Sequence, residues 1–200
     1  MEKLERILIA KKHVKYFFII GLILSSIGLL RIAYYHVKAE VAQIMIKSAW
    51  EEMNSVVDNN KNIKPWPWAD TWPVMQIEFP DLDESSIVLK DASGESLAFG
   101  PGLMTSDILP GDIGNSFIAA HRDTHFSSIG RLKRSQMIHV TLNSGISYSF
   151  KIDKIKIVDS RSEQPWVNTN EKRITLVTCY PFDGSISNTP FRYLVSAVLI

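Results

Sequence analysis

The hydrophobic pattern divides the chain into an apolar N-terminal segment and a longer region of short alternating runs. Tyr16–Leu30 is uncharged and predominantly apolar, Arg31 follows it, and Ile32–Tyr35 continue the apolar character. The strict run is shorter than the about 20 residues of a spanning helix, but flanking aromatic and arginine side chains extend such a segment by reaching the interface. We therefore predict a transmembrane signal anchor over residues 16–37.

Basic residues dominate the chain before this apolar segment. They are Lys3, Arg6, Lys11, Lys12 and Lys15, against Glu2 and Glu5. Cytoplasmic flanks of membrane helices carry an excess of Lys and Arg, so residues 1–15 are predicted to be cytoplasmic and the C-terminal domain to lie across the membrane. A cleaved signal peptide is the alternative, but Ala33-Tyr34-Tyr35 and Val37-Lys38-Ala39 both fit a cleavage site badly.

Helical spacing continues beyond the apolar segment. Ala39–Met53 carries Val41, Ile44, Met45 and Ala49 on one stripe, with polar residues between them, which is typical of a packing face. Ser55–Lys64 is polar and rich in turn-forming residues. We predict a helical stalk and linker over residues 38–64, followed by one domain over residues 65–200.

From Pro65 onward, short runs typical of β-strands alternate with turn signals. The candidate strands are Val74–Phe79, Ser86–Leu89, Ser116–Ala120, Ile138–Leu142, Ile146–Val158, Ile174–Thr178 and Phe191–Ile200. Many short strands at this spacing favour a mainly β fold, either a closed barrel or a sandwich. The stretch Pro65–Trp68 is interpreted as an aromatic clasp over one barrel end, because buried aromatic rings dominate packing energies.

Composition and charge narrow the functional classes. The 200 residues suit one domain with an appendage, and the 22 basic residues nearly balance the 21 acidic ones, giving a net charge of +1. A near-neutral chain gives no argument for nucleic acid as a partner. The function must therefore be argued from local sites.

The chain contains one cysteine, Cys179, which excludes an intrachain disulfide. Cys179 follows the apolar run Ile174–Thr178, and Pro181 prevents that run from continuing as a central strand. A side chain at a strand end is held rigidly and can face a cleft, which suits a nucleophile. A nearby His or Arg would supply the reactive thiolate. The alternative is a buried cysteine that packs as a small apolar residue.

Among the five histidines, His121 is the best candidate partner for this cysteine. His13 and His36 flank the apolar segment, and His139 lies within a candidate strand. His121 directly follows the apolar run Phe117–Ala120, whereas His125 lies farther along the same polar loop. A strand-end histidine gains significance only when it is paired with a similarly placed cysteine.

A zinc site is an alternative interpretation of the same segment. His121 and His125 are spaced i, i+4, as in the helical motif of zinc proteases, but strand-forming residues precede them and Arg122 stands where that motif has its Glu base. Further ligands, Cys179 or Asp123, would have to converge on the ion. These departures make a metal site the weaker hypothesis.

Arg192 begins the last candidate strand, beyond the loop Pro181–Pro190. An arginine keeps its charge in a partly desolvated cleft and presents a planar fork of donors. Such a group can stabilise the negative oxygen that develops when a thiolate attacks a carbonyl. Taken alone, it would be an ordinary surface arginine.

Together these segments resemble the sortase family of cysteine transpeptidases. The family motif Thr-Leu-x-Thr-Cys stands here as Thr175–Cys179, and its histidine segment stands as Gly114–Arg122, with Ala120 where the family commonly has Gly. Arg192 begins the final strand, as the family's arginine does. The resemblance covers about Trp72–Val198, and residues 65–73, 121–126 and 178–182 look like the sortase class of Gram-negative proteobacteria.

The resemblance implies a sortase-like closed eight-stranded β-barrel with short helices, an inner-membrane anchor and a periplasmic catalytic domain. It implies Cys179 as nucleophile, His121 as acid/base, Arg192 as oxyanion stabiliser and Thr178 as an aid to substrate positioning. The implied substrate is a protein with a Leu-Pro-x-Thr-Gly-like C-terminal sorting signal, which passes through a thioacyl-enzyme to an amine acceptor without a cofactor or metal.

Two other functions remain as alternatives. A cysteine peptidase would release the same protein by hydrolysis, because water would resolve the thioester. A non-enzymatic periplasmic β-barrel binding module would simply bury Cys179, and its thiol would be inert.

Overall fold

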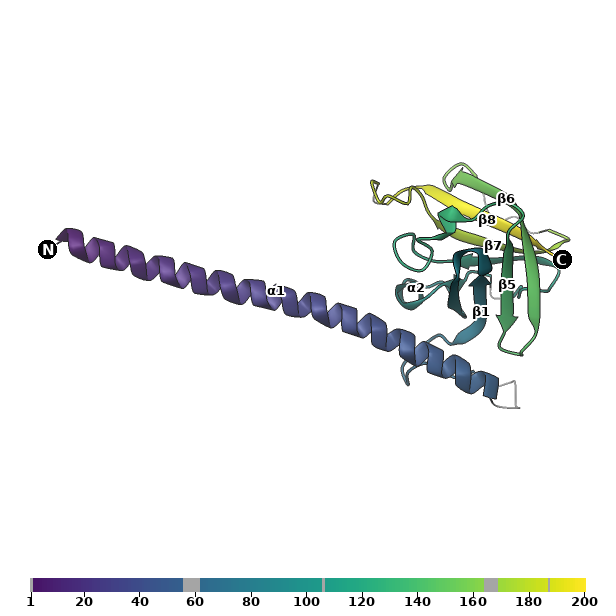
Figure 1. The fold of residues 1–200 in the computed structure, drawn as a ribbon, viewed down its shortest axis with the longest axis horizontal. Coiled ribbons are helices and arrows are strands. Elements are labelled where there is room, and N and C mark those ends of the chain that lie inside the picture. The colour runs from purple at the N-terminus through teal and green to yellow at the C-terminus, as the bar shows by residue number, and fades with distance from the viewer. Residues whose placement is uncertain (1, 56–61, 106, 164–168, 187) are drawn as a thin grey trace. The chain divides into compact units, whose positions relative to one another are not determined.

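The computed structural model describes residues 2–55, 62–105, 107–163, 169–186 and 188–200. Its first element is a continuous helix, α1 (Glu2–Ser55) (Figure 1). The predicted anchor and stalk therefore form one helix, whereas most of the predicted linker Ser55–Lys64 lies outside the described residues. The chain divides into two compact units, residues 1–41 and residues 42–200.

Within the described residues, α1 contains one segment long and apolar enough to cross a bilayer. The span Lys15–Ser55 includes an 18-residue window of mean hydropathy 2.0, and none of that window is buried. Phe17 is 79% exposed and Leu24 is 63% exposed, so the helix surface is apolar where the anchor is predicted. A signal sequence has the same properties, and the orientation of the segment stays a prediction.

The second unit is a β-barrel closed by eight strands, which confirms the predicted fold class. The strands are β1 (Pro73–Phe79), β2 (Glu84–Leu89), β3 (Gly102–Leu103), β4 (Gly114–Ala119), β5 (Met137–Leu142), β6 (Ser147–Asp159), β7 (Lys172–Cys179) and β8 (Phe191–Leu199). Their order around the barrel is β1-β2-β3-β4-β7-β8-β6-β5. Figure 1 shows β8, in yellow, between β6 and β7.

Three short helices connect these strands. They are η1 (Pro80–Leu82), α2 (Gly94–Phe99) and η2 (Ile129–Arg131). The α2 helix begins after Ser93, whose hydroxyl accepts the Ser96 amide and so satisfies one of the free donors of the first turn. β3 was not among the strands predicted from sequence, because its two residues are too few to show a period.

The barrel interior follows from strand alternation. In β5, Ile138, Val140 and Leu142 are buried while the residues between them are partly exposed, so alternate side chains fill the core. Gly102 permits a close approach of two segments, because a Cβ there would lie 2.2 Å from the Asp91 carbonyl oxygen.

A second hydrophobic cluster lies outside the barrel interior. Ala42 and Ile46 of α1 pack with Trp66, Ala69 and Leu89. The Trp66 ring meets Phe99 edge-on, at 5.1 Å between centroids. Trp66 is therefore a packing residue, whereas Trp68 is 77% exposed. The position of Pro65–Trp68 over one barrel end stays a prediction.

Candidate active site

Three adjacent strands bring the predicted site residues to one end of the barrel. β4 and β7 run parallel, with Ala119 opposite Val177, so His121 and Cys179 each lie two residues beyond the same pair. β8 runs antiparallel to β7, with Arg192 directly opposite Cys179. The strand register thus unites residues that are 58 and 13 positions apart in the chain.

These side chains line one cleft of about 450 Å³. The lining residues are His121, Arg122, Asp123, Cys179, Asn188, Thr189 and Arg192. The cleft therefore contains a thiol, an imidazole and two guanidinium groups, which is the set of groups needed to attack a carbonyl and to stabilise the resulting charge.

Cys179 is the last residue of β7 and is partly exposed. The residues before it, Ile174–Thr178, are all buried, so a rigid strand holds the thiol at the edge of the core. A partly exposed cysteine beside cationic groups is the environment in which thiols react, whereas a packing cysteine is enclosed by apolar atoms. The structure thus gives no support to a merely buried Cys179.

Backbone hydrogen bonds hold the chain just before and just after His121. The Ala120 amide donates to the Val177 carbonyl over 3.2 Å, which extends the β4–β7 pairing by one residue. After the imidazole the chain turns back, and the Phe126 amide donates to the His121 carbonyl over 3.0 Å. The backbone at His121 is therefore fixed, although the His121 side chain is exposed.

Thr178 belongs to the wall behind the cleft. Its buried hydroxyl donates to the Ala120 carbonyl over 2.7 Å. This bond ties the residue before Cys179 to the residue before His121. The hydroxyl proton of Thr178 is already donated to this carbonyl. Contact between the Thr178 side chain and a substrate therefore stays a prediction from the family resemblance.

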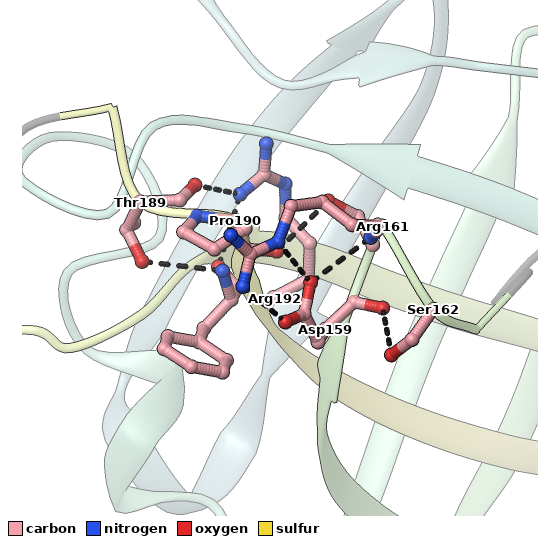
Figure 2. Close-up of polar contacts among 8 residues, drawn as sticks. Asp159, Arg161, Ser162, Thr189, Pro190 and Arg192 are labelled. Atoms are coloured by element: carbon pink, nitrogen blue, oxygen red, sulfur yellow. Dashed lines mark hydrogen bonds and ion pairs between the residues drawn. The ribbon is translucent and has the colours of Figure 1, made fainter.

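Arg192 is oriented by the loop that precedes it. Figure 2 shows its guanidinium against the Thr189 carbonyl, to which Nη1 donates over 2.6 Å, and Nη1 also donates to the Phe191 carbonyl over 3.0 Å. Nε and Nη2 make no hydrogen bond to a residue within the described ranges. Among the described residues, these two donors therefore have no protein acceptor.

The end of β6 supports the same loop. The Ser160 amide and hydroxyl both donate to the Pro190 carbonyl, over 3.0 and 2.8 Å. Beside it, Asp159 and Arg161 form an ion pair, which lowers the pKa of the Asp159 carboxyl to about 2 through hydrogen bonds from Arg161 (Figure 2). The backbone before Arg192 is thus fixed from a neighbouring strand.

Sequence reasoning did not assign Arg122, Asn188 or Thr189 to the cleft. Arg122 departs from the zinc-protease motif and ends the family's histidine segment, and its position directly after His121 was a usable signal for a place in the cleft. Asn188 and Thr189 lie in the β7–β8 loop, whose course is not encoded in any periodicity. No sequence pattern indicates that these two residues line a cleft with Cys179.

His125 does not line the cleft with Cys179. It lines a separate groove formed by the last turns of α1 and by β1 and β2. Burial lowers the pKa of His125 below its ordinary value of 6.5, and electrostatic repulsion from the neighbouring His121 lowers it further. Within the described residues no three His, Cys, Asp or Glu side chains gather to hold a metal ion.

The lowered pKa of His125 predicts a pH-dependent stability. Below pH 6.5 the unfolded chain takes up a proton that folded His125 does not, so the folded state loses stability as the pH falls from 6.5 to the folded pKa. Thermal unfolding of the wild type and His125→Gln between pH 8 and 5 measures this. The unfolding temperature of the wild type is expected to fall more steeply with decreasing pH than that of His125→Gln. Parallel curves would contradict the lowered pKa of His125.

Comparisons with known proteins agree with this geometry. A family model described as the Sortase domain matches residues 77–200, which is more than half of the chain. Sortase D of Bacillus subtilis is 28% identical over 120 residues, 60% of this chain and 60% of that protein. Sortase A of Listeria monocytogenes is 31% identical over 110 residues, 53% of this chain and 49% of that protein. The chain belongs to the sortase family.

Solved structures show the same fold. The crystal structure of Listeria monocytogenes sortase A has a TM-score of 0.57 at 26% identity, covering 64% of this chain and 87% of that one. A Clostridium perfringens Sortase D5 transpeptidase has a TM-score of 0.64 at 21% identity, covering 80% of this chain and 99% of that one. The match to the two curated relatives spans less than two thirds of each, so it defines the family rather than a particular activity.

Proposed function

We propose that this protein is a membrane-anchored cysteine transpeptidase that cleaves a C-terminal sorting signal resembling Leu-Pro-x-Thr-Gly and joins the cleaved protein to an amine acceptor. The observation that carries the proposal is that the sole cysteine lies opposite Arg192 and shares a cleft with His121. Membership in the sortase family supports the same conclusion.

In the first half-reaction, the Cys179 thiolate attacks the backbone carbonyl carbon of the Thr in the signal. The C–S bond forms as the carbonyl oxygen becomes negative, and Nε and Nη2 of Arg192 are the donors that we assign to that oxygen. When the C–N bond breaks, His121 gives a proton to the departing amine. The product of this step is a thioester between Cys179 and the substrate.

In the second half-reaction, the incoming amine attacks the thioester carbonyl. His121 removes the proton that the amine loses, the C–S bond breaks, and the thiolate of Cys179 is restored. A peptidase would follow the same path with water in place of the amine. The two functions therefore differ only in the group that resolves the thioester.

Product analysis separates these two functions. A sorting-signal peptide incubated with the full-length protein is expected to yield a transfer product when hydroxylamine is added and little product without it. Release of the free acid at the same rate in both samples would identify a peptidase.

Arg192→Lys is expected to lower kcat/KM by about 10²–10³-fold, because removal of an oxyanion donor costs about that much and a point charge cannot replace a planar fork. Steady-state kinetics of the full-length variant measure this effect. Arg131→Lys is the matched control, since Arg131 is exposed, is paired with Glu84 and does not line the cleft. Equal loss in both variants would contradict the role given to Arg192.

We further propose that α1 is retained as a single-pass anchor with a cytoplasmic N-terminus. The basic residues before Tyr16 support this orientation. Resemblance of three segments to the sortase class of Gram-negative proteobacteria supports an inner-membrane location and a periplasmic barrel.

A reporter enzyme that is active only outside the cytoplasm tests this topology when it is fused after Ile200. The fusion is expected to be active and to fractionate with membranes at full length. A soluble mature form that begins near residue 39 would instead establish signal cleavage.

A further inference from the structure

Arg122 directly follows His121, yet its side chain binds the segment that follows Cys179. Nη1 donates to the Pro181 carbonyl over 2.8 Å, and Nη2 donates to the Ile186 carbonyl over 2.7 Å. The two terminal nitrogens thus bridge the two ends of one loop segment. A planar guanidinium suits this task because its donors have a fixed spacing.

The hydrogen bonds of Arg122 join the segment carrying His121 to the segment after Cys179, outside the barrel. Inside the barrel, β4 and β7 are joined by their ladder and by the Thr178 hydroxyl on the Ala120 carbonyl. That pairing ends near Ala120, so His121 lies beyond it, while Cys179 is paired only with β8. Because Arg122 is bonded to His121 through the chain, its hold on the loop restricts where the imidazole can lie relative to the thiol.

The start of the loop is anchored by packing on its other side. The Phe182 ring meets Tyr193 edge-on at 5.1 Å and Tyr180 at 6.2 Å, and a Cβ on Gly130 would lie 2.8 Å from the Phe182 ring. At the other end of the segment, the Ile186 side chain is 46% exposed. The bond from Arg122 to the Ile186 carbonyl therefore holds a more exposed part of the loop.

We propose that Arg122 is a positioning residue that clamps the loop after Cys179 to the segment carrying His121 and so sets the geometry of the thiol and the imidazole. Both terminal nitrogens of Arg122 are used by protein carbonyls, which distinguishes it from Arg192, whose Nε and Nη2 have no protein acceptor among the described residues. Arg122 contacts neither reacting atom in this role. The kinetic consequences rest on the proposed transpeptidation.

The test compares the full-length wild type with Arg122→Ala, Arg122→Lys and, as a control, Arg131→Ala. Arg131 is an exposed arginine that is paired with Glu84 and does not line the cleft. The first measurement is steady-state transfer of a sorting-signal peptide to hydroxylamine. Both Arg122 variants are expected to lose about 10–100-fold in kcat with KM within about twofold of wild type, because misplaced catalytic groups slow the chemical step without weakening binding.

Arg122→Lys separates a clamp from a charge. Lysine preserves the positive charge but cannot span two carbonyls with a fixed fork, so it is expected to resemble Arg122→Ala. A wild-type kcat for Arg122→Lys would overturn the proposal and assign an electrostatic role. A raised KM at unchanged kcat would also overturn it, because that result defines a substrate contact.

Amide hydrogen exchange provides a readout that needs no substrate. Amides within Phe182–Ile186 are expected to exchange about tenfold or more faster in both Arg122 variants than in Arg131→Ala, while those of β7 and β8 stay protected. Unchanged exchange in the loop would overturn the clamp. If the wild type shows no transfer activity but the exchange result holds, the proposed function fails and the clamp stands.

Discussion

Cys179→Ala is expected to reduce transpeptidation to the background rate while leaving the barrel folded. Cys179 is the only cysteine in the chain, so no second thiol can take its place. The substitution removes one sulfur atom from a partly exposed strand end, which creates no large cavity in the core. Kinetics with a sorting-signal peptide, together with circular dichroism, measure the two parts of this prediction.

The control for this experiment is Ser127→Ala, which removes another small polar group at an exposed position outside the cleft. Its activity is expected to match the wild type. If purified Cys179→Ala still cleaved the peptide, the nucleophile would have to be a different residue and the mechanism would be wrong.

His121→Ala is expected to lower kcat by about 10²–10⁴-fold, because it removes the group that protonates the leaving amine. His125→Ala is the matched control, as it removes a second imidazole from the same loop. The structure places His121 in the cleft with Cys179 and places His125 in a separate groove. The expected loss for His125→Ala is therefore far smaller.

Steady-state kinetics of the two variants show which histidine is the acid/base group, and circular dichroism excludes unfolding as the cause of a loss. An inactive His125→Ala beside a nearly normal His121→Ala would show that the motif alignment is displaced by one turn. Loss of wild-type activity on addition of a chelator would favour the zinc interpretation of this segment.

The longer strands could be predicted because their apolar runs are bounded by turn residues. Ile174–Thr178 lies within β7, and Pro181 follows its end, as the sequence indicated. β3 could not be predicted, since two residues show no alternation and its glycine is required by a contact with distant backbone. The stripe predicted on Ala39–Met53 was only partly right, because Ala49 is buried but Val41 and Ile44 are 46% and 67% exposed. The face that packs is carried by Ala42 and Ile46, whose partners, such as Leu89, had no signal in the sequence.

The candidate site was predictable to the extent that its residues stand at strand ends. Cys179 and His121 both follow apolar runs, and the strand order then places them in one cleft. The residues that orient them carry no such pattern. Arg122 binds carbonyls 59 and 64 positions away, and Ser160 binds a carbonyl 30 positions away. Any residue can supply a carbonyl, so these contacts leave no trace in the composition of the partner segments.

Mass spectrometry of the thioacyl-enzyme tests the central claim most directly. The full-length protein is mixed with a sorting-signal peptide, quenched in acid, and digested so that the peptide containing Cys179 can be weighed. The expected result is a mass increase equal to the N-terminal part of the signal up to its Thr, confined to Cys179, and transfer of that part to hydroxylamine when the amine is added. Cleavage of the signal with no adduct on Cys179 at any time, and with product formation unaffected by prior alkylation of the thiol, would contradict it.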